Sequence, residues 1–266
     1  MIRRSNSSGG LGIRLIIGLV IAVISVLSYL GSQTYNPVVG ENQHLSLTPE
    51  QEIALGLQSA PEMVQEFGGV DPDSNAQATV DAIGAKLVNS SKAKDTPWQF
   101  EFTVLGDPET INAFALPGGP VFITEALLSR LQTEDQIAGV LSHEIVHVLA
   151  RHSAQQIAKS DLTNGLLGAV SVASGDASTT QTAAMVAQLV NMKYGRDDET
   201  QADTIGICLM IDAQYDPNAM VEVMQILEQA SGGSQQPEWF STHPSPQNRI
   251  QNIKQAIAEA STKCPL

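Results

Sequence analysis

Two histidines four residues apart, with a glutamate directly after the first, form the sequence HEIVH at positions 143–147. Positions i and i+4 share one face of an α-helix, so His143 and His147 can reach one metal ion only if this segment is helical. Thr133 followed by Glu134 gives a helix start, and apolar residues recur at helical spacing at Ile137, Val140, Leu141, Ile145 and Val148. The motif therefore requires a fold that places a mostly buried helix at a metal site.

The residue types in this motif favour zinc. His143 and His147 supply two imidazole ligands, while Glu144 borders the same site and can take a proton from water without being a ligand. A chance match on an ordinary helix is the alternative, but the chain has only 5 histidines in 266 residues. We therefore expect one Zn²⁺ per chain, with Glu144 as the general base.

A catalytic zinc site needs a third protein ligand. The extended motif HExxHxxGxxH is excluded, because Ala150 and Ser153 stand where it needs glycine and histidine. His152 is out of register with the pair, so we expect it at the surface or beside a ligand. Glu199 and Asp203 lie four residues apart on a predicted helix, which suits a ligand and an acceptor for a histidine N–H. A solvated acidic face is the alternative.

The rest of the chain mixes helices with a few short strands. WQFEFTVL (Trp98–Leu105) alternates apolar and polar residues as a half-buried strand does, and INAFAL and PVFIT are two more strands joined by Pro117–Gly119. Helices are predicted for TPEQEIALGLQ, with Thr48 as its N-cap, and for NAQATVDAIGAKLVNSS. Residues 160–190 suggest two short helices around a turn near Gly175, either a helical hairpin of the core or a mobile flap.

The N-terminus predicts a membrane segment. MIRRSNSSGGLGIR is basic, and the apolar run Leu15–Leu30 follows it. Upstream positive charge predicts a cytoplasmic N-terminus. A cleaved signal peptide is the alternative, although Ser28-Tyr29-Leu30 fits a cleavage site poorly. We expect residues 1–14 in the cytoplasm, a transmembrane signal anchor at 15–31, a polar linker at 32–47 and a catalytic domain at 48–266.

Charge and cysteine content narrow the options further. The net charge is −14, although three of the 14 basic residues (Arg3, Arg4 and Arg14) precede every acidic one. The acidic remainder argues against nucleic-acid binding, which needs a basic face. Cys208 and Cys264 are too few for a disulfide framework. The sequence does not decide whether they form one disulfide bond or are two unrelated thiols.

Several segments together resemble one enzyme family. LSHEIVHVLARH, RDDETQAD, NAFALPGGPVFITEALL, TPEQEIALG and STHPSPQNRI resemble, in composition and order, the HtpX-like and CAAX-prenyl-protease-type zinc metallopeptidases (gluzincins), and in particular their small BepA/LoiP-like envelope branch. The resemblance implies that His143, His147 and Glu199 are the zinc ligands, Glu144 is the base and Asp203 supports a ligand. Gln201 stands where the family often has a second glutamate, and we expect little effect from this.

The same resemblance assigns roles to the C-terminal element. It implies that His243 lies over the metal, either donating to the developing oxyanion or serving as a removable fourth ligand that keeps the enzyme latent. Arg249 would assist His243 as a catalytic residue. The extended strand at Asn112, Ala113, Phe114 and Ala115 would bind substrate by adding a peptide strand at its edge; a purely structural sheet edge is the alternative.

The expectation is therefore an α+β, mainly helical zincin-type metalloprotease domain, with a small sheet beside the HExxH helix and one N-terminal transmembrane helix. Such a protein would be a single-pass inner-membrane zinc metalloendopeptidase, or a secreted periplasmic one if the signal is cleaved. It would hydrolyse unfolded or misfolded envelope proteins on the periplasmic side, with envelope assembly factors as candidate partners. The alternative is a chaperone-like assembly factor with little proteolysis. A prenyl-protein protease is disfavoured, because the chain has one credible membrane span.

Overall fold

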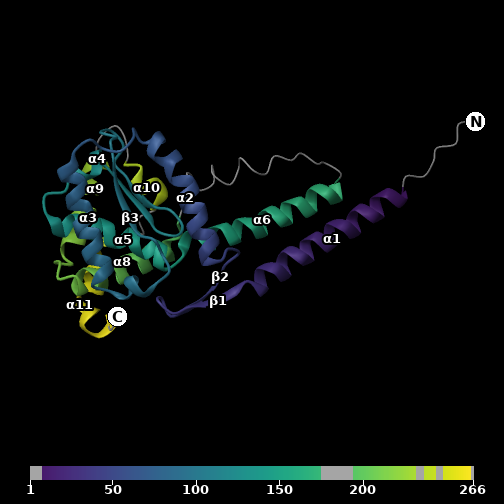
Figure 1. Ribbon diagram of the computed structural model, residues 1–266. Coiled ribbons are helices and arrows are strands. Elements are labelled where there is room, and N and C mark those ends of the chain that lie inside the picture. The colour runs from purple at the N-terminus through teal and green to yellow at the C-terminus, as the bar shows by residue number, and fades with distance from the viewer. Residues whose placement is uncertain (1–7, 175–193, 232–236, 244–247, 265–266) are drawn as a thin grey trace, which may run out of the picture. The chain divides into compact units, whose positions relative to one another are not determined.

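The computed structural model of the chain describes residues 8–174, 194–231, 237–243 and 248–264. The chain divides into two compact units, whose elements are labelled in Figure 1. The N-terminal unit comprises residues 1–48 and 154–187, and the larger unit comprises residues 49–153 and 188–266.

Among its described residues, the N-terminal unit has one helix with the character of a membrane span. Helix α1 (Ser8–Gly31) includes a 21-residue stretch, Leu11–Gly31, that is long and apolar enough to cross a membrane. Its large apolar side chains are mostly exposed. The predicted N-terminal apolar helix is thus present, beginning somewhat before the expected run.

A β-hairpin follows α1, where the sequence indicates a polar linker. Strands β1 (Gln33–Asn36) and β2 (Glu41–His44) pair in antiparallel fashion. Gly40 donates its N–H to the Asn36 carbonyl at 2.9 Å with φ of +74°, a conformation that favours glycine. The buried Asn36 side chain also donates to Gln43 at 3.1 Å. Two polar four-residue strands carry no apolar alternation, so the sequence pattern does not reveal them.

The larger unit contains a three-stranded sheet in the order β3–β5–β4. Strand β3 (Glu101–Leu105) runs parallel to β5 (Pro120–Thr124), and β4 (Ala113–Ala115) runs antiparallel to β5. The three strands predicted from the sequence are confirmed, although β3 starts three residues after Trp98. Among the described residues β4 pairs on one side only, so it forms an edge of the sheet.

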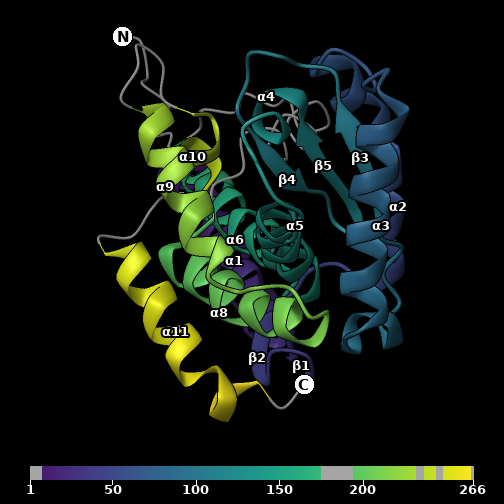
Figure 2. The same ribbon diagram turned by 90° about the vertical axis from the view of Figure 1, so that its left-hand side faces the viewer.

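Helix α5 (Glu134–Leu149) carries the HEIVH sequence and runs through the middle of this unit. The Thr133 hydroxyl accepts the Gln136 N–H at 3.2 Å, which confirms the predicted start. Every residue from Gln136 to Leu149 is buried. Figure 2 shows α5 end-on, with the sheet and α3 (Ser74–Asn89) on one side and α8 (Arg196–Asp212) and α9 (Ala219–Ser231) on the other.

The expected class, mainly helical with a small sheet, is confirmed. The remaining helical elements of this unit are α2 (Pro49–Glu66), η1 (Lys92–Asp95), α4 (Glu125–Leu128), α10 (Trp239–Thr242) and α11 (Arg249–Lys263). Helix α2 begins at Pro49, as predicted. It packs tightly on the turn between β4 and β5, because a Cβ on Gly56 would collide with the Pro117 carbonyl oxygen. The turn itself has Gly118 at φ of +83°.

Helix α6 (His152–Ser174) is longer than predicted. The first of the two short helices expected within residues 160–190 is the C-terminal part of this single 23-residue helix. The second helix and the turn near Gly175 lie outside the described residues.

Cys208 and Cys264 form a disulfide bond, which settles a pairing that the sequence leaves open. The bond links α8 to the C-terminal end of α11, across a sequence separation of 56 residues. Closing a loop of this length stabilises a fold by up to about 4 kcal/mol in the chain-entropy treatment. The helix that carries Glu199 is therefore tied covalently to the end of the helix that begins at Arg249.

Candidate metal centre

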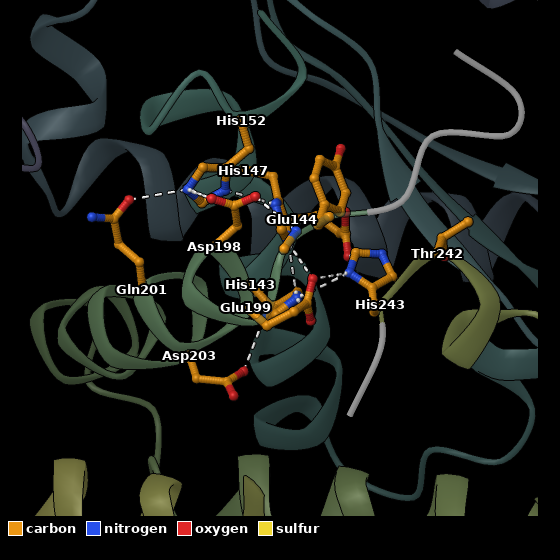
Figure 3. Close-up of polar contacts among 12 residues, drawn as sticks. His143, Glu144, His147, His152, Asp198, Glu199, Gln201, Asp203, Thr242 and His243 are labelled. Atoms are coloured by element: carbon orange, nitrogen blue, oxygen red, sulfur yellow. Dashed lines mark hydrogen bonds and ion pairs between the residues drawn. The ribbon is translucent and has the colours of Figure 1, made fainter. Parts of the chain in front are cut away.

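Two imidazoles and one carboxylate meet inside the larger unit (Figure 3). The Nε2 atoms of His143 and His147, on one face of α5, lie 3.0 Å apart. Glu199, in the first turn of α8, brings its carboxylate oxygens to 3.4 Å from His143 Nε2 and 3.5 Å from His147 Nε2. All three side chains are at most 2% exposed. The structure thus brings together the three residues expected as ligands.

The start of α8 fixes the position of Glu199. The Asp198 carboxylate accepts the Gly195 N–H at 2.8 Å, and Asp197, Asp198 and Glu199 all lie in the first turn. Negative charge is favourable there because of the helix dipole. The acidic run therefore stabilises the helix end from which Glu199 reaches the histidines.

His243 is the fourth member of the cluster. It directly follows α10 and is fully buried, with its ring stacked on Trp239 at 4.3 Å between centroids. Its Nδ1 atom lies 3.0 Å from Glu199 Oε1 and 3.3 Å from His143 Nε2. The structure therefore places His243 beside the three candidate ligands.

The geometry of these four residues fits a metal ion. Their ligand atoms all lie within 4.8 Å of one another. Nitrogen and oxygen ligands 2.0–2.1 Å from a tetrahedral zinc ion lie about 3.3 Å from each other. Five of the six pairs have separations between 3.0 Å and 3.5 Å, measured to one or the other Glu199 oxygen. Glu199 Oε2 is buried and accepts no hydrogen bond in the described part of the chain, although Arg249 Nη1 lies 3.1 Å from it.

Burial and neighbouring charges favour the protonation states that a metal needs at His147 and Glu199. At His143 burial lowers the pKa, but the contacts with Asp203 and Glu199 outweigh it and raise that pKa to about 9, so a metal would have to displace this proton. Burial, together with the nearby His143, holds the pKa of His147 well below its usual value, so its imidazole is neutral. Burial raises the pKa of Glu199, but the positive field of His243 and a hydrogen bond from His143 outweigh it and keep that pKa well below normal. A neutral imidazole and an ionised carboxylate are the forms that bind zinc.

Glu144 lies beside the cluster rather than within it. Both carboxylate oxygens are buried and have no hydrogen-bond partner among the described residues, and Oε1 lies 3.6 Å from His243 Nε2. Burial raises the pKa of this carboxyl group. Burying a carboxylate that accepts no hydrogen bond costs free energy on folding. Such groups occur mainly at functional sites, so Glu144 is a candidate general base.

Asp203 and Arg249 form a second layer behind His143. Asp203 accepts from His143 Nδ1 at 2.9 Å, which turns Nε2 of that ring toward the cluster. Arg249, 3% exposed, donates to both oxygens of Asp203 at 2.8 Å, and its Nη1 lies 3.1 Å from Glu199 Oε2. Burial raises the pKa of Asp203, but the Arg249 guanidinium more than compensates and lowers it. Arg249 therefore contacts the carboxylates of the cluster, which differs from the expected contact with an oxyanion.

His152 contacts the candidate ligand His147, although the helical register of the sequence puts it on a different face from His143 and His147. It is buried, which excludes the surface alternative, and its Nδ1 lies 2.8 Å from Nδ1 of His147. Its Nε2 lies 3.0 Å from Gln201 Oε1. Gln201, which replaces the second glutamate of the family motif, thus ends a chain of contacts that runs through His152 to His147.

A left-handed residue explains how His152 reaches His147. Helix α5 ends at Leu149, and Arg151 adopts φ of +56°, so α6 starts in a new direction. This conformation is strained for arginine. It is held by Glu52 of α2, which is 1% exposed and accepts from Arg151 Nε at 2.8 Å. Nothing in the local sequence signals such a turn.

Two aromatic residues complete the surroundings of the cluster, and sequence reasoning assigned a role to neither. Tyr194 stacks on His147 with centroids 3.9 Å apart, and its hydroxyl lies 3.1 Å from the Ser153 hydroxyl. Trp239 stacks on His243, four residues later in the chain. Position offers the only sequence signals: Tyr194 precedes the acidic run, and Trp239 lies one helical turn before His243.

A narrow cleft borders the cluster and the edge strand. Asn112, Phe114 and Ala115 line it together with His243, whereas Ala113 is buried in the sheet. Its other walls include Met63, Phe67, Leu116, Tyr194 and Glu238. Three of the four residues expected to bind substrate therefore border an apolar space next to the metal cluster.

Comparison with known proteins agrees with this geometry. The model of peptidase family M48 matches residues 74–257, which include the whole cluster. The mitochondrial metalloendopeptidase OMA1 of Schizosaccharomyces pombe is 32% identical over 238 residues, covering 88% of this chain and 69% of that protein. The beta-barrel assembly-enhancing protease of Escherichia coli K12 is 32% identical over 232 residues, covering 82% of this chain and 46% of that protein.

The chain thus spans about half the length of the bacterial relative and somewhat more of the fungal one. Both relatives carry the name of a peptidase, and the matched region holds the buried histidine and glutamate cluster with Glu144 beside it. The chain therefore belongs to peptidase family M48, and it is a metalloendopeptidase.

Proposed function

We propose that this protein is a zinc-dependent endopeptidase that cleaves unfolded or misfolded proteins of the cell envelope. The observation that carries the proposal is the four-residue cluster with the buried Glu144 beside it, whose carboxylate accepts no hydrogen bond from any described residue. Three imidazole nitrogens and one carboxylate suit zinc better than calcium or magnesium, which prefer oxygen ligands. His143, His147 and Glu199 would hold the ion.

Zinc, when bound, supplies a Lewis acid that polarises the scissile carbonyl and lowers the pKa of water to about 7. Residues of the chain would transfer the proton and hold the ligands in position. Glu144 takes the proton of the attacking water and transfers it to the leaving amine. Asp203 holds the His143 ring in place, and His152 does the same for His147. Arg249 holds Asp203 and Glu199, which is a positioning role.

Substrate would bind as an extended strand along the open edge of β4. Main-chain hydrogen bonds to a strand edge require no particular sequence, which suits cleavage of unfolded segments. The apolar cleft beside β4 would accept one substrate side chain, with Phe114 and Leu116 in its wall. Glu238, whose pKa is raised by burial and by Glu66 and Asp107 nearby, adds negative character to the lining.

Removing the metal tests the proposal directly. Unfolded casein should be cleaved by the purified protein, cleavage should stop with a zinc chelator, and added Zn²⁺ should restore it. X-ray absorption at the zinc edge should report three or four nitrogen and oxygen ligands near 2.0–2.1 Å. Cleavage that persists after complete metal removal would contradict the proposal, and Glu199→Gln should show the same loss as chelation.

We further propose that His243 acts as a latch in the resting enzyme. A catalytic zinc site keeps one position open for water or substrate, and His243 Nδ1 lies within ligand distance of the other three residues. The stacking on Trp239 supports this resting position. Movement of His243 would free the site, and its ring could then donate to the oxyanion of the bound substrate.

Replacing His243 with alanine should therefore raise the basal cleavage of casein. If the latch is closed in about nine molecules of ten, the cleavage rate is about tenfold lower than that of an always open enzyme. Removing the latch should therefore raise the rate several-fold. The measurement is the initial rate at saturating zinc, with His44→Ala in the N-terminal unit as the matched control. A fall in rate with an unchanged zinc content would instead assign His243 to oxyanion stabilisation alone.

A chaperone-like assembly factor is the second candidate function. It is favoured only by the position of His243 at the fourth ligand site, which would leave the enzyme closed. It predicts that parent and His243→Ala bind unfolded clients but cleave none of them. The same casein assay, with a pull-down of the uncleaved client, separates the two functions.

The proposed location is the inner membrane, with α1 as an uncleaved anchor, residues 32–47 as its connection and the domain from residue 48 on the periplasmic side. Arg14 and the arginines upstream of α1 favour a cytoplasmic N-terminus. The Cys208–Cys264 disulfide supports an oxidising compartment for the larger unit. Periplasmic assembly factors are candidate partners, and secretion after signal cleavage is the alternative.

A further inference from the structure

The last part of α6, residues 162–174, has an unusual surface for a protein in water. It contains no ionisable residue. Three of its apolar side chains are exposed: Leu166, Leu167, which is 62% exposed, and Val170, which is 65% exposed. Large exposed apolar surfaces mark a contact with a partner or with lipid. We call residues 162–174 the α6 tip.

The α6 tip packs closely against α1 within the N-terminal unit. A Cβ on Gly18 would lie only 2.6 Å from the backbone oxygen of Ala169 and 3.1 Å from the Ala173 methyl group. A Cβ on Gly165 would likewise collide with Ser25. The two backbones thus approach each other through small residues. This mode of packing is typical of helices within membranes, where no hydrophobic effect drives helices together.

These contacts also set the depth of the tip along α1. Gly165 lies beside Ser25 and Ala169 beside Gly18, so α6 runs antiparallel to α1. Gly18 is 13 residues from Gly31, which ends the candidate span, and at 1.5 Å per residue this is about 20 Å of helix. The hydrocarbon core of a bilayer is about 30 Å thick. If α1 crosses the bilayer, Ala169 lies deep in that core.

The polar end of the pair fits a membrane surface. Ser28, Tyr29 and Asp161 line one surface pocket. Asp161 is the last charged residue of α6, and tyrosine is enriched at the membrane interface. The polar groups therefore gather where α1 ends, and the apolar tip points away from them along α1.

We propose that the α6 tip is embedded in the bilayer beside α1, with Leu166, Leu167 and Val170 facing lipid acyl chains. The helix enters the membrane from the side that holds the larger unit, because α6 begins in that unit at His152 and the chain belongs to it again at Tyr194. This inference rests on the proposed membrane anchor.

Quenching by brominated lipid tests the proposal on the full-length protein in lipid nanodiscs. The two native cysteines are paired, so a single introduced cysteine can carry a bimane fluorophore. Val170→Cys and Leu167→Cys are the test positions, with Val23→Cys on the exposed face of α1 as the positive control. Leu57→Cys, an exposed apolar position of the larger unit, is the negative control.

Phosphatidylcholine with brominated acyl chains should quench the fluorophore at positions 170 and 167 at least half as strongly as at 23, and should leave position 57 unaffected. Quenching at 23 without quenching at 170 and 167 would overturn the proposal while leaving the anchor in place. Absence of quenching at 23 would overturn the anchor itself, and this inference with it.

A pair of glycine variants tests the contact with α1. Gly18→Val, which would push Ala169 away, should reduce the quenching at position 170. Gly12→Val is the matched control, because a Cβ at Gly12 meets nothing within 4 Å. It should leave the quenching unchanged. If Gly18→Val also leaves it unchanged, α1 does not hold the tip and the proposal is wrong.

Discussion

Replacing Glu144 with glutamine is expected to lower kcat/KM for unfolded casein by about 10²–10⁴-fold, which is the usual contribution of a general base. Glutamine has the same shape and can still form hydrogen bonds, but it cannot accept the proton of the attacking water. Glu144 is 0% exposed and does not belong to the ligand cluster. Zinc content, measured by elemental analysis, should therefore stay at one ion per chain.

The stability of this variant separates loss of chemistry from loss of fold. A buried carboxylate without hydrogen-bond partners costs free energy on folding, so Glu144→Gln should unfold at the same temperature as the parent or higher. Glu134→Gln is the matched control, because it changes an exposed glutamate on the same helix. A variant with normal zinc content that still cleaves at the parental rate would exclude Glu144 as the base.

The part of the site that lies on regular helices could be predicted from the sequence. His143 and His147 share a face because α5 is regular through both, and Glu199 with Asp203 shares a face of α8 for the same reason. Strand β3 followed from the alternation of apolar and polar residues. In each case one repeating pattern within a single element decides where the side chain points.

The features that could not be predicted from the sequence depend on contacts between distant segments or lack a periodic pattern. His152 is out of register with His147 on a continuous helix, but the left-handed Arg151 turns α6 back, and that turn is held by Glu52 about a hundred residues earlier. The β1–β2 hairpin is polar and short, so it has no periodic signal. His243 came from the family resemblance alone, because no local pattern relates it to a helix 100 residues away.

The contacts of Arg249 favour a role in positioning other side chains. The resemblance suggested help with the oxyanion. Its guanidinium instead donates to both oxygens of Asp203 and lies 3.1 Å from Glu199. Burial disfavours its charge, but the neighbouring carboxylates outweigh this and raise its pKa. A side chain held in this way by two carboxylates has little freedom to reach a substrate oxygen.

Arg249→Ala is therefore expected to loosen the metal site and the fold together. Removing one partner of a buried ion pair costs about 3–5 kcal/mol, which should lower the unfolding midpoint by roughly 10 °C for a domain of this size. Loss of a residue that orients the ligands should weaken zinc binding by about 10–100-fold. Thermal unfolding and a zinc titration against a competing chelator measure the two effects.

The zinc dependence of the rate then separates positioning from catalysis. If Arg249 acts through Asp203 and Glu199, saturating zinc should restore most of kcat in Arg249→Ala. Arg249→Lys should recover some zinc affinity because it keeps the positive charge. The recovery should be partial, because lysine cannot make the bidentate contact with Asp203. If Arg249 stabilises the oxyanion, kcat should stay low at any zinc concentration while the affinity for zinc is normal. The bidentate contact with Asp203 leads us to expect the first result.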